Sequence, residues 1–272
     1  MARTRSGPSW LAPRVVQDRH PPRFGCVKYL NARPLVHGWT GEVQLDHPAA
    51  LCAKLARGDV DFALVSSFEF LRNPIYRIVD DISISSDGPV YSVVVAHRGN
   101  ISETEEIELD PASETSVNLL RCLLAESKLT PRLVARSTST PGNRAARLLI
   151  GDQAIRFRQM YGNEFEYWDL GQQWKKLVDL PFVFALWLVR PEVADPKRIA
   201  DRLRALRDEN LAQIDDLIAE EKEFDREFCA RYYREHLRFT FGEKEKEGLR
   251  SFQRLCQEHG LLPIREIDFN LV

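Results

Sequence analysis

The stretches "PVYSVVVAH" (89–97) and "PFVFALWLVR" (181–190) decide the fold predicted for this chain. Each is a nearly continuous run of β-branched, aromatic and aliphatic residues, the pattern of a strand that is buried on both faces. The residues between them alternate strand-like and helix-like segments, and can form a small α/β lobe of their own. Such a lobe has two connections to the rest of the chain, as a hinge requires. The two stretches therefore predict two lobes with a ligand cleft between them.

The residues that precede this lobe indicate the other lobe. Short apolar runs at 24–30 and 59–66 are typical of strands. Between them, "PAALCAKLARG" (48–58) has helical spacing, with Pro48 in the first turn and Gly58 at the end. Strand, helix and strand in this order favour βαβ units, and the predicted class is α/β with mixed, mostly parallel sheets.

The chain changes character after residue 194, where it becomes charged and helix-periodic. This pattern predicts a helical C-terminal region that packs its Leu and Ile side chains on the sheet. We expect lobe I to contain residues 24–96 and 186–272, and lobe II to contain residues 97–185. Residues 1–23 are rich in Arg and Pro and are expected to form a disordered extension.

The composition of the chain limits its partners. It has 272 residues, a formal net charge of −2 and a pI near 6.3. Because no basic surplus is present, nucleic acid is not an expected partner. No run of about 18 apolar residues occurs, so neither a membrane-spanning helix nor a membrane partner is predicted. The N-terminus lacks the apolar core of a signal peptide, and the predicted location is the cytoplasm.

The cysteines and histidines predict no metal site. The five cysteines are odd in number and scattered, without a Cys-x-x-Cys or Cys/His spacing, so they predict a reducing compartment rather than a disulfide framework. The six histidines do not cluster with cysteines or carboxylates, and we expect each to be structural or exposed.

Hydroxyl side chains gather where predicted strands meet helices or further strands, in "VSSFE" (65–69), "SISSDGPVYS" (83–92) and "ASETSVN" (112–118). A Ser or Thr at the start of a helix is an ordinary N-cap. Together with backbone N–H groups, it also makes a neutral site for a carboxylate. The pattern leaves both interpretations open, the second with a small dicarboxylate as ligand.

Two single polar residues raise the same question. In "GCVKYLNARPL" (25–35), Asn31 stands where a predicted strand ends, as a turn residue or as a substrate ligand. Ser92 stands inside an otherwise apolar predicted strand and needs a partner, either the backbone or a ligand.

Five segments carry a resemblance to a known family. In chain order they are "VKYLNARPL", "ARGDVDFALVSSFEFLRN", "SDGPVYSVVV", "LLIGDQAI" and "YWDLGQQWKKLVDLPFVFALW". Together they resemble the chorismate dehydratase family, which acts first in the futalosine route to menaquinone. The resemblance covers about residues 24 to 190. It implies the two-lobed type II periplasmic-binding-protein fold and the loss of water from chorismate, without a metal or organic cofactor.

The resemblance also implies a set of site residues. The family's active-site asparagine and serine fall on Asn31 and Ser92, which are expected to be catalytic. The expected substrate-binding residues are Ser67, Gly88, Pro89, Thr115, Ser116 and Asp152.

Two other functions stay open. One is a cytoplasmic carboxylate-binding or sensor protein of the same fold that closes on its ligand without reaction. The other is the sister 1,4-dihydroxy-6-naphthoate synthase, which relies on a histidine base that has no equivalent here. The charged C-terminal helices are compatible with a homodimer.

Overall fold

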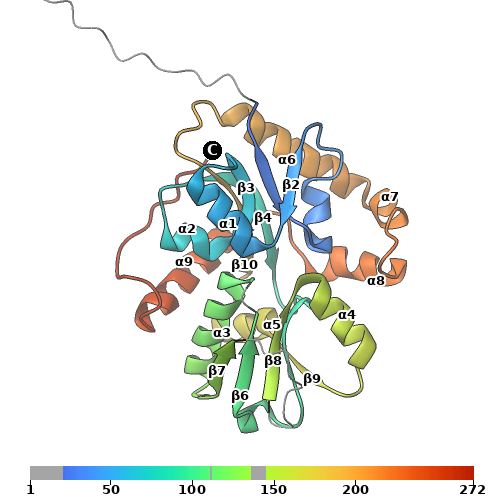
Figure 1. Cartoon of the computed structure of the whole chain (residues 1–272), viewed down its shortest axis with the longest axis vertical. Coiled ribbons are helices and arrows are strands. Elements are labelled where there is room, and N and C mark those ends of the chain that lie inside the picture. Colours follow the sequence, from blue (N-terminus) through green and yellow to red (C-terminus); the bar gives the residue numbers. More distant parts are fainter. Residues whose placement is uncertain (1–20, 111, 136–144) are drawn as a thin grey trace, which may run out of the picture.

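A computed structural model describes residues 21–110, 112–135 and 145–272 (Figure 1). These residues contain two five-stranded sheets, with the strand orders β2-β1-β3-β10-β4 and β7-β6-β8-β5-β9. The first sheet contains β1 (Phe24–Val27), β2 (Val43–Asp46), β3 (Phe62–Ser66), β4 (Arg77–Ser86) and β10 (Phe182–Val189). The second contains β5 (Val93–His97), β6 (Glu106–Leu109), β7 (Arg132–Ala135), β8 (Ala145–Ile150) and β9 (Glu166–Asp169).

Each sheet has one strand that runs against the others. In the first sheet β10 is antiparallel to β3 and β4, and the remaining pairings are parallel. In the second sheet β5 is antiparallel to β8 and β9, and the remaining pairings are parallel. The predicted α/β class with mixed, mostly parallel sheets is therefore confirmed. The reversed strands are those that the two opening stretches predicted.

The two reversed strands also show where the chain passes between the sheets. Residues 87–92 connect β4 to β5, and residues 179–181 connect the second sheet's last helix to β10. The limits expected after residues 96 and 185 fall inside β5 and β10. We propose that lobe I and lobe II divide at the two connections instead. Residues 1–20 of the expected extension lie outside the described residues.

The helices are shared between the lobes (Figure 1). Those that accompany the first sheet are α1 (Pro48–Arg57), α2 (Ser67–Arg72), α6 (Lys197–Ala212), α7 (Ile214–Ala219), α8 (Arg226–Arg231) and α9 (Glu243–Glu258). Those of the second lobe are α3 (Glu114–Glu126), α4 (Gly151–Tyr161) and α5 (Leu170–Val178). Three shorter turns are η1 (Leu30–Leu35), η2 (Ile101–Glu103) and η3 (Tyr232–His236). In Figure 1, α8 lies beside the junction of the lobes.

The first connection is a bend, not the start of a strand. Asp169 caps α5 at the N–H of Gln172, and its two carboxylate oxygens also accept the N–H groups of Val90 and Tyr91, at 3.1 and 2.7 Å. These N–H groups are therefore not available to a sheet, and Tyr91 takes a φ of 67°. The strand predicted over 89–97 accordingly begins only at Val93.

An aromatic cluster joins the second connection to the C-terminal region. Trp174 of α5, Phe182 of β10 and Phe252 of α9 lie with their ring centroids 5.0 to 6.1 Å apart in edge-to-face contacts. All three side chains are fully buried. Because edge-to-face pairs stabilise beyond their buried area, this cluster holds α9 against both lobes.

Candidate active site

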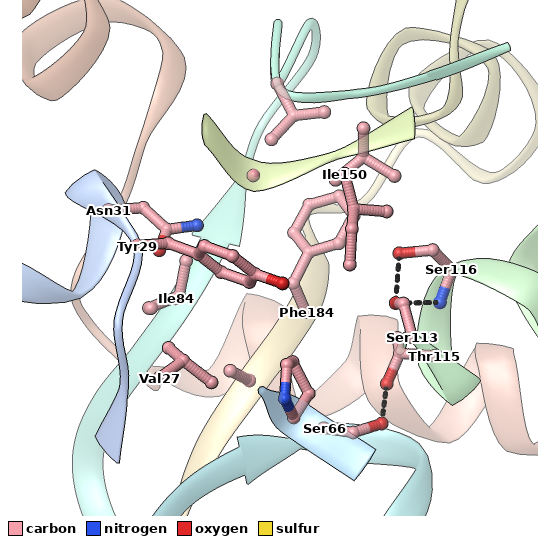
Figure 2. Close-up of a pocket in the computed structure, with 15 residues that line it drawn as sticks. Val27, Tyr29, Asn31, Ser66, Ile84, Ser113, Thr115, Ser116, Ile150 and Phe184 are labelled. Atoms are coloured by element: carbon pink, nitrogen blue, oxygen red, sulfur yellow. Dashed lines mark hydrogen bonds between the residues drawn. The ribbon is translucent and has the colours of Figure 1, made fainter. Parts of the chain in front are cut away.

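A cavity lies between the two lobes, where strands of both sheets end and α3 and α4 begin (Figure 2). The space open to the centres of water molecules is about 60 Å³, enough for roughly four waters. Its apolar wall includes Val27, Ile84, Val90, Val93, Ile150 and Phe184, and its polar groups come from Tyr29, Asn31, Ser66, Ser113, Thr115 and Ser116. Among the described residues that line it, none carries a carboxylate, ammonium, guanidinium or imidazole group.

Hydroxyl groups form one end of this cavity, which we call the hydroxyl end (Ser66, Ser113, Thr115 and Ser116). Thr115 Oγ1 hydrogen-bonds Ser66 Oγ and accepts the N–H of Phe68 at 3.1 Å. Ser113, the N-cap of α3, accepts the N–H of Ser116 at 3.2 Å and donates to its hydroxyl at 2.7 Å. Because Thr115 belongs to the second lobe and Ser66 and Phe68 to the first, these bonds cross the cleft and hold it closed.

Ser67 stands next to this group but does not line the cavity. It is fully buried, and its hydroxyl donates to the carbonyl of Val183 at 2.7 Å. Its neighbour Ser66 faces the cavity instead. The junction "VSSFE" therefore brings a hydroxyl to the cavity wall, but from the residue before the expected Ser67.

Asn31 forms the opposite, amide end of the cavity (Figure 2). It lies in the 3₁₀ turn η1, not at a strand end, because β1 stops at Val27. Its Oδ1 is buried and has no hydrogen-bond partner in the protein. Leaving a buried acceptor unpaired costs about 1–3 kcal/mol. An acceptor in this position suits a ligand that brings a donor.

Asp152 clamps the turn that carries Asn31. It stands in the first turn of α4, outside the cavity wall, and accepts the N–H of Leu30 at 2.8 Å. The hydroxyl of Tyr233 donates to the carbonyl of Leu30 at 3.0 Å, so both backbone groups before Asn31 are held. Burial raises the pKa of Asp152 above its ordinary value, and the bond from Leu30 opposes that rise.

Ser92 lies directly behind the cavity wall. Its carbonyl accepts the N–H of Gly151 at 2.8 Å, and both Gly151 and Val93 line the cavity. Ser92 is fully buried, and its Oγ accepts a hydrogen bond of 2.6 Å from the hydroxyl of Tyr232. The partner that Ser92 needs is thus a side chain, and neither of the two kinds that we expected from the sequence.

The turn residues Gly88 and Pro89 also lie outside the cavity wall. The carbonyl of Gly88 accepts from the Ser86 hydroxyl at 3.0 Å, and the carbonyl of Pro89 lies 2.9 Å from Nδ1 of His236. A Cβ on Gly171 would come within 2.5 Å of the Gly88 carbonyl oxygen. This close approach leaves no room for a side chain at position 171.

Sequence reasoning did not select four residues that the structure brings to the site: Tyr29, Ser66, Ser113 and Tyr232. The first three stand within the quoted motifs, one or two residues from selected ones, so spacing alone could not separate them. Tyr29 packs on Gly151, whose φ is +56° and whose Cβ would lie 2.9 Å from the tyrosine ring. Burial, with Asp110 and Asp152, raises the pKa of Tyr29. For Tyr232 the available signal was two adjacent tyrosines in a charged segment.

Among the residues that the structure describes, no group of three or more His, Cys, Asp or Glu side chains is placed to hold a metal ion. No helix in this part of the chain has both the length and the apolar composition to cross a membrane.

Two α/β lobes with a cavity between them define a two-lobed α/β class of fold, and solved structures agree. A protein of Archaeoglobus fulgidus is similar with a TM-score of 0.67 and 19% identity, over 89% of this chain and 98% of its own. The periplasmic aliphatic sulphonate binding protein of Escherichia coli is similar with a TM-score of 0.63 and 13% identity, over 91% and 95%. The periplasmic-binding-protein-like fold is thereby confirmed.

Sequence comparison then identifies the family. A family model described as menaquinone biosynthesis matches residues 22–258. Chorismate dehydratase of Thermus thermophilus is 31% identical over 252 residues, which are 84% of this chain and 93% of that protein. The chain belongs to this menaquinone-biosynthesis family, and the resemblance seen in its motifs is confirmed.

Proposed function

We propose that the chain is a chorismate dehydratase, which converts chorismate to 3-[(1-carboxyvinyl)oxy]benzoate and water in menaquinone biosynthesis. The observation that carries the proposal is Asn31, whose Oδ1 is buried without a partner and which lines a cavity whose described lining residues carry no charged side chain. The similarity to the Thermus chorismate dehydratase supports the choice of substrate.

The reaction needs orientation more than electrostatic force. A proton leaves ring carbon 3 and hydroxide leaves ring carbon 4. The electrons of the broken C–H bond form the new ring double bond, and the ring becomes aromatic. Because aromatisation makes the elimination downhill, holding the reacting groups in place supplies much of what is required.

The base in this proposal is the substrate's own enolpyruvyl carboxylate. The described residues of the cavity wall offer amide, hydroxyl and phenol groups, which are poor bases at neutral pH. A substrate carboxylate held over ring carbon 3 takes the proton in place of a protein base and passes it to the departing hydroxide, so that water is released.

Each end of the cavity has its own role. Asn31 accepts a hydrogen bond from the substrate's ring hydroxyl and orients it for departure. At the hydroxyl end, Ser116 accepts a bond from Ser113, so its own proton is free to bind a carboxylate at the start of α3. The positive end of the helix dipole favours the same carboxylate. The bonds of Thr115 across the cleft exclude water during the reaction.

Incubation of the purified protein with chorismate tests the proposal. We expect a product lighter by one water, with the ultraviolet absorption of a substituted benzoate, and none without protein. Binding of chorismate without product would favour a binding or sensor protein. If the protein neither binds chorismate nor forms a product, a chorismate-specific function is contradicted. The sister synthase is then the next function to test.

A further inference from the structure

The π-helical turn η3 belongs to the C-terminal region, yet it contacts Ser92 of the expected catalytic pair and the carbonyl of Leu30, which precedes Asn31. Turns of this kind are rare and recur at functional sites. Its first two residues, Tyr232 and Tyr233, are 0% and 4% exposed. Buried phenols need hydrogen-bond partners, and these two find theirs beside the cavity.

Tyr232 is bound to Ser92. Its hydroxyl donates to Ser92 Oγ at 2.6 Å. Burial raises the pKa of Tyr232, while hydrogen bonding by Ser92 opposes that rise. The phenol therefore stays protonated at neutral pH and can donate to Ser92.

The direction of the bond matters for Ser92. A serine hydroxyl has one proton to donate and two positions at which to accept. Because Tyr232 is the donor, it occupies one accepting position, and the proton of Ser92 points away from the phenol. The carbonyl of the same Ser92 holds the N–H of Gly151, which lines the cavity, so the bond from Tyr232 fixes a residue that supports the cavity wall.

We propose that Tyr232 is a positioning residue for the dehydration, acting through Ser92. This inference rests on the proposed function and deepens it, because it gives the C-terminal region a part in the site. Tyr233 serves the same segment from the next position, since it holds the carbonyl that precedes Asn31.

Tyr232→Phe is the variant to test, because it removes only the hydroxyl. The ring of Phe228 stacks on Tyr232 with a centroid distance of 5.5 Å and an interplanar angle of 16°, and this contact does not need the hydroxyl. Tyr161→Phe is the matched control. Tyr161 lies in α4, half-buried, and it does not line the cavity.

The experiment compares kcat and KM for the wild type, Tyr232→Phe, Ser92→Ala and the double variant. We expect Tyr232→Phe to lower kcat about tenfold or more, the effect of losing one hydrogen bond that holds a reacting group, with KM changed less than about twofold. In the Ser92→Ala background the same change should have no further effect, because the group through which it acts is missing. Tyr161→Phe should match the wild type.

Two results would overturn the inference: a Tyr232→Phe variant with wild-type kcat, or a double variant whose losses multiply. If Tyr232→Phe does not fold, 3-fluorotyrosine at position 232 retains ring and hydroxyl but changes the donor strength. An unchanged kcat would then reject the inference. Should the wild type not turn over chorismate, the proposed function fails and the inference with it. If the wild type turns over chorismate and Tyr232→Phe does so at the same rate, the inference fails but the proposed function is unaffected.

Discussion

The two ends of the cavity treat their polar groups differently. At the hydroxyl end, Thr115 binds a hydroxyl and an N–H of the other lobe, and Ser113 and Ser116 bind each other. At the amide end, Oδ1 of Asn31 is buried without a partner. Buried polar groups are nearly always paired in folded proteins. The hydroxyl end therefore stabilises the closed protein, whereas the amide end keeps an acceptor for the substrate.

Asn31→Ala should break the amide end with the largest effect on activity. We expect turnover to fall roughly 100- to 1,000-fold, as when one positioned hydrogen-bonding group is removed from an active site. The free energy of unfolding should change by less than about 1 kcal/mol, because Oδ1 makes no bond in the protein. Steady-state rates and urea unfolding measure the two quantities.

Asn163→Ala is the matched control, since Asn163 is exposed in the turn after α4. Near wild-type turnover for Asn31→Ala would reject the catalytic role of Asn31, and so would an equal loss of turnover in the control variant.

Thr115→Val should disrupt the hydroxyl end, and there we expect the main loss to be in stability rather than in turnover. The change keeps the shape of the side chain but leaves the N–H of Phe68 without its acceptor. We expect the free energy of unfolding to fall by about 1–3 kcal/mol, and turnover to fall less than in Asn31→Ala. Urea unfolding of this variant beside Thr130→Val, an exposed threonine, measures the difference. Unchanged stability would show that these bonds across the cleft contribute little.

Asp152→Asn should have the smallest effect on turnover and sharpens the choice of base. Burial raises the pKa of Asp152, so its ionised form is less stable in the fold than in the unfolded chain. This cost is present above the raised pKa and disappears as pH falls through it. Asparagine still offers a carbonyl to Leu30. The free energy of unfolding of the variant at pH 7 should therefore equal that of the wild type or exceed it by up to about 1 kcal/mol, and the difference should shrink in acid.

Turnover of Asp152→Asn should stay within a few-fold of wild type, measured beside unfolding curves at several pH values. If turnover were abolished while chorismate still bound, a protein carboxylate would replace the substrate's own carboxylate as base.

Local patterns predicted the fold more fully than the site. The apolar runs at 59–66 and 181–190 report burial on both faces, and each is a strand of the first sheet. The strand predicted over 89–97 is confirmed only in part, because Asp169 accepts the N–H groups of two of its residues. That carboxylate stands about 80 residues away, and no periodicity reports such a partner.

The sequence by itself determined the α/β class, the apolar runs that contain β5 and β10, the family, and the choice of Asn31 and Ser92 as residues to test. Only the tertiary structure decided that Ser66 rather than Ser67 faces the cavity, that Asp152 clamps Leu30, and that Tyr232 reaches Ser92. The physical reason is the distance along the chain over which each kind of interaction acts. Periodicity and turn chemistry act over a few neighbouring residues, whereas Tyr232 and Ser92 are 140 positions apart and meet only when α8 packs beside both lobes.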